Sequence, residues 1–278
     1  MGPGAPRLTR IKCMDPKSYK EFYEDESEKY LPEDSQYYRH DRFFNIRRLA
    51  DRGGAARLRI LDVGCGNGYQ LSTLTGKHEV HGLDISEANI VLAAGNGIKA
   101  VLHDVESAFP YPDASFDVVV CSEILEHVFF PEKVVDACFR VLKPSGTFIV
   151  TVPNLYCFRN RLSLLIGRGA YFIEYPDNRI HIRFFSIPGM KKILADRGFE
   201  VIGVLGQHFA MNFNWPFKLI WYLHGGNRGL RLMIRVLTLG RKDPDRPGEV
   251  LQFHIFRFLG SLFPRLSPGL LFDCRRRA

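Results

Sequence analysis

The sequence predicts an α/β protein in which a doubly wound, mostly parallel sheet carries helices on both faces. Short apolar runs alternate with helical patterns from residue 58 onward, and this alternation is typical of parallel sheets. The first apolar run passes into a glycine-rich turn, and the second run ends in an acidic residue. Ligands of such sheets bind at the carboxyl ends of the strands, so these features predict a binding site there.

Six apolar runs are expected to form the strands, because each is short and bounded by polar or glycine-containing segments. They cover residues 57–63, 79–84, 99–103, 116–121, 147–153 and 199–205. Helical spacing of apolar residues predicts helices at 37–49, 71–74, 87–94, 132–142 and 187–197. A chain of 278 residues is long enough to bury the core of such a domain and to carry an appendage.

The chain divides into three expected parts. Residues 1–50 are expected to form an N-terminal arm and a lid helix, and residues 51–210 the ligand-binding domain. As a lid, the helix could offer Arg39, Arg42 or Arg47 to a ligand carboxylate; the alternative is a packing helix whose arginines face water. The strand-helix alternation stops at about 154–180, which predicts an inserted cap after the fifth strand. Residues 211–278 are expected to be a basic, aromatic helical extension. The net charge of +8 supports this division, because residues 205–278 hold 12 Lys and Arg against 4 Asp and Glu.

The composition also predicts where the protein acts. Six cysteines occur without the spacing of a disulfide scaffold, which favours reduced thiols in the cytoplasm. The N-terminus lacks the apolar core of a signal peptide, and no apolar run is long enough to span a bilayer. Aromatic, leucine and arginine residues in the C-terminal part are typical of helices at a membrane interface. They are equally compatible with a helical cap that packs on the sheet domain and directs its arginines to water. We therefore expect a cytoplasmic protein, and binding at the inner face of a membrane is one of two open roles for this part.

The strongest local feature is the stretch Ile60-Leu-Asp-Val-Gly-Cys-Gly-Asn-Gly68. Its three glycines permit positive φ angles and let a ligand approach the main chain at a helix N-terminus. Sixteen residues later Asp84 ends the second apolar run, where such folds present a carboxylate to ribose hydroxyls. A glycine turn alone is equally compatible with tight packing, but the acid at this distance favours a ligand site.

The spacing G-x-G-x-G behind Asp62 resembles motif I of the class I (type 11) S-adenosylmethionine-dependent methyltransferases. Tyr69 stands where the dinucleotide motif would need a glycine. The resemblance continues through 81–86, 103–105, 109–121 and 141–150, and it covers roughly residues 58–204.

This resemblance implies a Rossmann-like fold and S-adenosylmethionine as the cofactor. It implies that Asp84 holds the ribose diol and that Asp104 reads the adenine amino group. The residues implied to bind the cofactor are Asp62, Gly64, Cys65, Gly66, Gly68, Asp84, Ile85, Asp104, Val105 and Ser122.

A second cluster follows the fourth predicted strand. Glu123, Glu126 and His127 have i, i+3 and i+4 spacing, which would place them on one face of a helix. Two carboxylates and an imidazole suit Mg²⁺ or another divalent cation. The E-x-x-E-H spacing resembles the metal motif of ubiquinone-pathway O-methyltransferases and small-RNA 2′-O-methyltransferases. His181 falls where the latter place a further ligand, so the resemblance implies a four-ligand metal site.

Two readings without a metal remain open for this cluster. In the first, His127, His181 and Glu123 are catalytic, with an imidazole as the base that takes a proton from the acceptor hydroxyl. In the second, His127 only packs near the cofactor.

The expected activity is S-adenosylmethionine-dependent methyl transfer to an oxygen of a small or lipid-linked acceptor. The alternatives are an RNA 2′-O-methyltransferase that uses the metal site and a non-catalytic scaffold that binds S-adenosylmethionine. An anionic membrane surface is an expected partner of the basic C-terminal quarter, residues 205–278. Nucleic acid is less favoured, because leucine and phenylalanine separate the basic residues.

Overall fold

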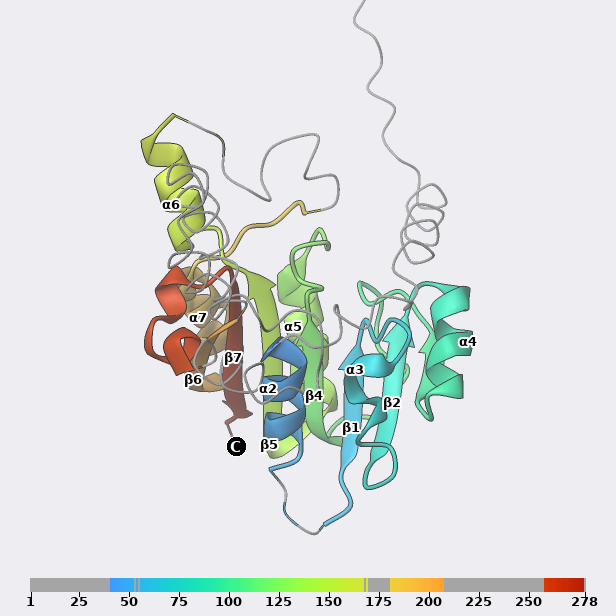
Figure 1. Cartoon of the computed structure of the whole chain (residues 1–278). Helices are drawn as coiled ribbons and strands as arrows, with labels where there is room; N and C mark the ends of the chain where they lie inside the picture. Colours follow the sequence, from blue (N-terminus) through green and yellow to red (C-terminus); the bar gives the residue numbers. More distant parts are fainter. Residues whose placement is uncertain are drawn as a thin grey trace, which may run out of the picture.

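The protein is described by a computed structural model that covers residues 41–52, 54, 56–167, 169, 181–207 and 258–277. Its seven strands are β1 (Arg59–Val63), β2 (Glu79–Asp84), β3 (Lys99–Leu102), β4 (Phe116–Ser122), β5 (Leu142–Pro153), β6 (Phe199–Gln207) and β7 (Gly269–Arg276). They form one sheet in the order β3-β2-β1-β4-β5-β7-β6 (Figure 1). Strands β1 to β5 pair in parallel, whereas β7 is antiparallel to both of its neighbours. The predicted doubly wound, mostly parallel sheet is confirmed.

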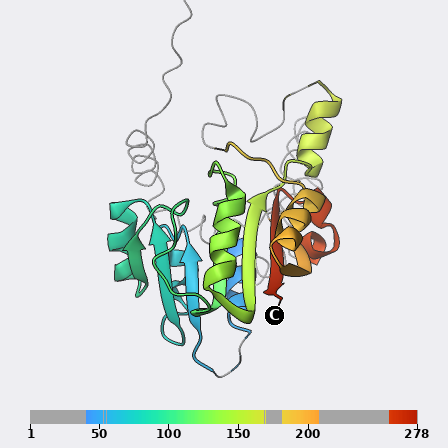
Figure 2. The ribbon, with the colours of Figure 1, turned by 180° about the vertical axis from the view of Figure 1, so that it is seen from behind.

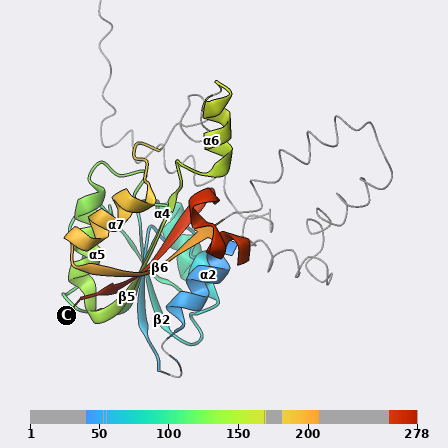
Figure 3. The same ribbon diagram turned by 90° about the vertical axis from the view of Figure 1, so that its left-hand side faces the viewer.

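Helices cover both faces of the sheet. One face carries α5 (Pro131–Val141) and α7 (Ile187–Asp196), which lie in front of the sheet in Figure 2. The other face carries α2 (Asp41–Ala50), α3 (Tyr69–Ser72) and α4 (Glu87–Gly95). Figure 3 shows α2 on the opposite side of the sheet from α5 and α7.

Strand β1 shows why the sheet needs helices on both sides. Its side chains alternate between two cores: Leu61 and Val63 belong to the core under α5 and α7. Ile60 belongs to the core that Ile46 of α2 and Leu71 of α3 complete. Because both sets are buried, the strand is largely apolar, as strands of parallel sheets are, and Asp62 is a buried exception.

The C-terminal segment differs from the prediction of a helical extension over 211–278. Residues 258–262 are helical, but Gly269–Arg276 is strand β7 between β5 and β6. Leu270 and Phe272 are fully buried in the sheet core. The prediction of a helix is therefore wrong for Gly269–Arg276, because this segment pairs its backbone with both β5 and β6. The predicted boundary at 211 lies outside the described residues.

Other expectations fall partly outside the described residues. The arm at 1–40, most of the cap at 168–180 and the segment 208–257 are not described. The described part of the cap includes α6 (Phe158–Leu165), which extends beyond the carboxyl edge of the sheet in Figure 1. None of the described helices combines the length and the apolar character needed to cross a membrane.

Candidate active site

The glycine loop connects β1 to α3 at the carboxyl edge of the sheet. Gly64, Gly66 and Gly68 have φ angles of 71°, 52° and 77°, which side-chain-bearing residues rarely adopt. A Cβ on Gly68 would lie 2.7 Å from Cγ1 of Ile98, and a Cβ on Gly64 would collide with Ile124. A Cβ on Gly66 would meet no atom within 4 Å. Gly66 therefore faces open space that a ligand can enter, whereas Gly64 and Gly68 are required for packing.

Asp84 is held beside this loop by hydrogen bonds. Its carboxylate accepts from the backbone N–H of Gly66 at 2.8 Å and from that of Ser86 at 3.0 Å. Asn89 donates a third bond at 3.2 Å. The side chain that was predicted to bind ribose thus also fixes the loop, and Ile85 follows it as a half-buried residue.

Asp62 and Cys65 are buried beneath the loop. Gln70 Nε2 donates to Asp62 Oδ1 at 3.2 Å. Burial raises the pKa of the Asp62 carboxyl well above its usual range, and the nearby Asp84 carboxylate raises it further. Burial also raises the pKa of the Cys65 thiol. The thiol lies against Gly82, where a Cβ would come within 2.6 Å of Sγ. The side chain of Cys65 therefore faces the core, and any ligand contact must come from its backbone.

The remaining predicted cofactor residues follow β3 and end β4. Asp104 is exposed and its Oδ1 accepts from the backbone N–H of Glu106 at 2.9 Å. Val105 packs against the sheet core. Ser122 Oγ lies 3.0 Å from Thr151 Oγ1. These residues share the carboxyl edge of the sheet with the glycine loop, and their binding roles stay predictions.

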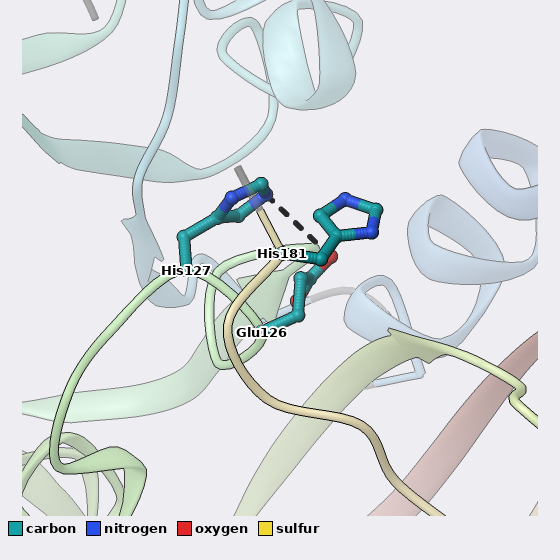
Figure 4. A group of neighbouring side chains, drawn as sticks. All are labelled: Glu126, His127 and His181. Atoms are coloured by element: carbon teal, nitrogen blue, oxygen red, sulfur yellow. Dashed lines mark ion pairs between the residues drawn. The ribbon is translucent and has the colours of Figure 1, made fainter. Parts of the chain in front are cut away.

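The E-x-x-E-H segment is a turn rather than a helix. Glu123 has a left-handed φ of 56° directly after β4, so the predicted helical arrangement is wrong. The turn nevertheless brings Glu126 and His127 together with His181 from a distant segment (Figure 4). One ligand atom from each of these three residues lies within 4.8 Å of the others. Glu123, the fourth predicted ligand, lies outside this group.

Backbone hydrogen bonds fix the segment that carries His181. The N–H groups of Ile182 and Arg183 donate to the carbonyl of Glu126 at 2.8 and 3.1 Å. The rings of His127 and His181 meet edge to face, with centroids 4.8 Å apart. Two segments far apart in the sequence are thus joined at the cluster itself.

Glu126 is the most deeply buried member of the cluster. It is 1% exposed, and its carboxylate oxygens have no hydrogen-bond partner among the described residues. Burial raises the pKa of Glu126 well above its usual range, and the Glu123 carboxylate raises it further. Burial lowers the pKa of His181, which favours the neutral imidazole that binds metals or accepts protons. A divalent cation therefore fits these donors, since it would compensate the buried carboxylate.

Glu123 is held by two residues from other elements. Thr151 Oγ1 donates to its Oε1 at 2.7 Å, and Arg42 Nη1 of α2 lies 3.3 Å from its Oε2. Sequence reasoning gave Thr151 no role, because it reads as part of an apolar strand. The ion pair between Arg42 and Glu123 joins segments that are far apart in the sequence, so no local sequence pattern indicates it.

Comparison with known proteins places this chain in a family. Residues 36–204 match the family described as a methyltransferase domain. The chain belongs to this family, within the class I S-adenosylmethionine-dependent methyltransferases.

Three relatives show the range of similarity. A Mycolicibacterium smegmatis protein described as a probable S-adenosylmethionine-dependent methyltransferase is 34% identical and matches 57% of this chain and 58% of its own length. A ubiquinone biosynthesis O-methyltransferase of Psychrobacter arcticus is 31% identical, over 56% of this chain and 64% of the relative. The corresponding protein of Thiobacillus denitrificans is 37% identical, over 59% and 74%. The chain thus spans less than two thirds of the length of the first two relatives.

Solved structures support the fold. A Thermotoga maritima S-adenosylmethionine-dependent methyltransferase is 22% identical with a TM-score of 0.51, over 69% of this chain and 84% of that one. Phosphoethanolamine N-methyltransferase 2 of Haemonchus contortus, in complex with S-adenosyl-L-methionine, is 13% identical with a TM-score of 0.52. That likeness covers 85% of this chain and 52% of the other. At sequence identities this low, the likeness shows a shared fold alone.

Proposed function

We propose that the protein transfers a methyl group from S-adenosylmethionine to an oxygen of a small or lipid-linked acceptor. The observation that carries this proposal is the contact between two candidate sites at one edge of the sheet. Gly64 of the glycine loop packs directly against Ile124, which lies between Glu123 and the buried Glu126. A cofactor over the loop and an acceptor at the Glu126–His127–His181 cluster would therefore be neighbours.

The residues of the chain would supply alignment and a proton acceptor. S-adenosylmethionine, when bound, provides a methyl group on a sulfonium. The acceptor oxygen forms its bond to the methyl carbon as the carbon–sulfur bond breaks, so the reacting atoms must be held in line. The hydroxyl must also lose its proton. His181 is suited to take this proton, because burial lowers its pKa and keeps the imidazole neutral.

A divalent cation such as Mg²⁺ is the second part of the proposal. Glu126, His127 and His181 would hold it through their clustered ligand atoms. A cation held there would lower the pKa of the acceptor hydroxyl, and the imidazoles would then act as ligands. Without a cation, one of the imidazoles is the base.

The surroundings of the cluster favour an acceptor with apolar parts. Phe129, Phe130, Ile182 and Phe184 are exposed and lie within three positions of His127 or His181 in the sequence. Relatives named ubiquinone biosynthesis O-methyltransferases support oxygen as the acceptor atom. The basic C-terminal quarter supports an anionic membrane on the cytoplasmic side as the surface where a lipid-linked acceptor is met.

Transfer of a labelled methyl group to a panel of acceptors tests the proposal. The panel contains phenolic quinone precursors, lipid-linked hydroxyl compounds and RNA, each with Mg²⁺ and with a chelator. We expect labelling of the phenolic or lipid-linked compounds, and a loss of labelling on chelation if the cation takes part. Labelling confined to RNA 2′-hydroxyls would establish the alternative acceptor. Cofactor binding without transfer to any acceptor would establish a scaffold.

A further inference from the structure

Glu123 occupies the first position of the E-x-x-E-H segment but does not join the cluster of ligand atoms. Its left-handed φ of 56° turns the chain directly after β4. Its side chain is about one quarter exposed, at 27%. Glu123 is near enough to the cluster for its charge to raise the pKa of Glu126, but its own carboxylate contacts other partners.

Those partners come from two elements that pack beside β4. Thr151 of β5 donates a hydrogen bond at 2.7 Å to one carboxylate oxygen. Arg42 of α2 lies 3.3 Å from the other oxygen, and its side chain is only 9% exposed. Because the Arg42 side chain is shielded from solvent, dissolved salt screens this ion pair only weakly.

The two acidic residues of the segment thus have different surroundings. Glu123 has a guanidinium and a hydroxyl as close partners. The Glu126 carboxylate has no hydrogen-bond partner among the described residues, and its Oε1 lies 3.7 Å from Nε2 of His127 (Figure 4). Arg42 acts on both, because its charge also favours the ionised form of Glu126 and so opposes the rise in the pKa of that carboxyl. A divalent cation at the cluster would therefore meet the positive charge of Arg42 nearby.

We propose that Arg42 competes with a divalent cation for the Glu123 carboxylate. Without the cation, Arg42 and Thr151 hold Glu123 away from Glu126, His127 and His181. With the cation, Glu123 leaves Arg42 and becomes the fourth ligand. Arg42 is thus a positioning residue that lowers the affinity of the cluster for the divalent cation. Binding of the cation would break the contact between α2 and Glu123. The inference rests on the metal site proposed above.

Mn²⁺ titration followed by electron paramagnetic resonance tests this competition in the full chain. Arg42→Gln should bind Mn²⁺ about tenfold more tightly, since a charge at this distance has an effect of about that size. Thr151→Val removes the other hold on Glu123 without changing any charge, and it should give a smaller gain. The double variant Arg42→Gln/Glu123→Gln should show no gain. Arg48→Gln removes the same charge from an exposed position of α2 and is the matched control.

The outcomes distinguish competition for Glu123 from simple repulsion between Arg42 and the cation, and from the absence of a metal site. A gain that persists in the double variant, or an equal gain in Arg48→Gln, would overturn the competition, because the charge alone would explain it. Unchanged affinity in both Arg42→Gln and Thr151→Val would also overturn it. If neither the wild type nor any variant binds Mn²⁺, both the proposed metal site and the inference that rests on it are wrong. Binding of S-adenosylhomocysteine by the same samples shows whether the methyltransferase proposal stands and whether the variants are folded.

Discussion

At the scale of residues, two acids of the candidate active site are almost completely buried. Asp62 is 1% exposed beneath the glycine loop, and Glu126 is 1% exposed in the cluster. In both, burial raises the pKa of the carboxyl, and a second carboxylate nearby raises it further. Such groups lower the stability of the folded state, and they concentrate at functional sites.

Replacing Asp62 with Asn should stabilise the ligand-free protein in a pH-dependent way. Because the pKa of Asp62 is raised on folding, the wild type loses unfolding free energy as the pH rises above the ordinary carboxyl pKa of about 4. The Asn variant lacks this loss. We expect it to be more stable by about 1 to 3 kcal/mol at about pH 8, and by less at about pH 5. Denaturant unfolding at the two pH values measures the difference, and a gain independent of pH would contradict the explanation.

Replacing His181 with Ala should remove transfer without removing cofactor binding. His181 lies at the cluster and not at the glycine loop, so its loss affects the acceptor side. A general base contributes about 100-fold to 10,000-fold to a rate, and we expect a decrease of that size in kcat. Isothermal titration with S-adenosylhomocysteine is the control and should give the wild-type affinity. Wild-type turnover in this variant would exclude His181 as base and as ligand.

At the scale of elements, the turn after β4 shows what spacing can and cannot predict. The i, i+3 and i+4 pattern identified the residues but predicted a helix. The structure instead has Glu123 in the left-handed region, and the carbonyl of Glu126 accepts hydrogen bonds from Ile182 and Arg183. These bonds come from a segment far along the chain, so local spacing could not indicate them. The closeness of His181 was implied only by family resemblance.

Strand β7 shows a second limit of local patterns. Its sequence ends in charged residues, and its apolar part is short, so it reads as the end of a basic tail. Its partners β5 and β6 lie far back in the sequence. Asp273 is accommodated at 5% exposure because Arg52 lies 2.5 Å away. Pairing with these distant strands makes the segment a strand, and its composition does not indicate such pairing.

Truncating a side chain of β7 should therefore destabilise the whole sheet. Phe272 is fully buried, so Phe272→Ala should lower the unfolding free energy by about 3 to 5 kcal/mol. Phe258 precedes the strand and is 61% exposed, and Phe258→Ala should change stability by less than about 0.5 kcal/mol. Denaturant unfolding of the two variants makes the comparison. Equal small effects would mean that the C-terminal segment is peripheral to the fold.

At the scale of the whole molecule, the rhythm of strands and helices predicted most of the architecture. All six predicted strands are present. The central strands β1, β4 and β5 are buried on both faces, which explains why they are largely apolar in sequence. The rhythm also predicted the edge of the sheet where the site lies, since parallel strands end together there. Which side chains meet at that edge, such as Arg42 with Glu123, depends on packing between elements and follows only from the structure.

The central claim is that the carboxyl edge of the sheet binds S-adenosylmethionine. Isothermal titration with S-adenosylhomocysteine, on the wild type and on Asp84→Ala, tests it most directly. Asp84 organises the glycine loop through Gly66 and is the predicted ribose ligand. Because hydrogen bonds to a charged group contribute about 1.5 to 3 kcal/mol each, we expect a loss of affinity of about 100-fold or more in this variant. Asp196→Ala, at an exposed acid of α7, should bind like the wild type. Clear wild-type binding that Asp84→Ala abolishes is the predicted result, and no binding by the wild type would contradict the account.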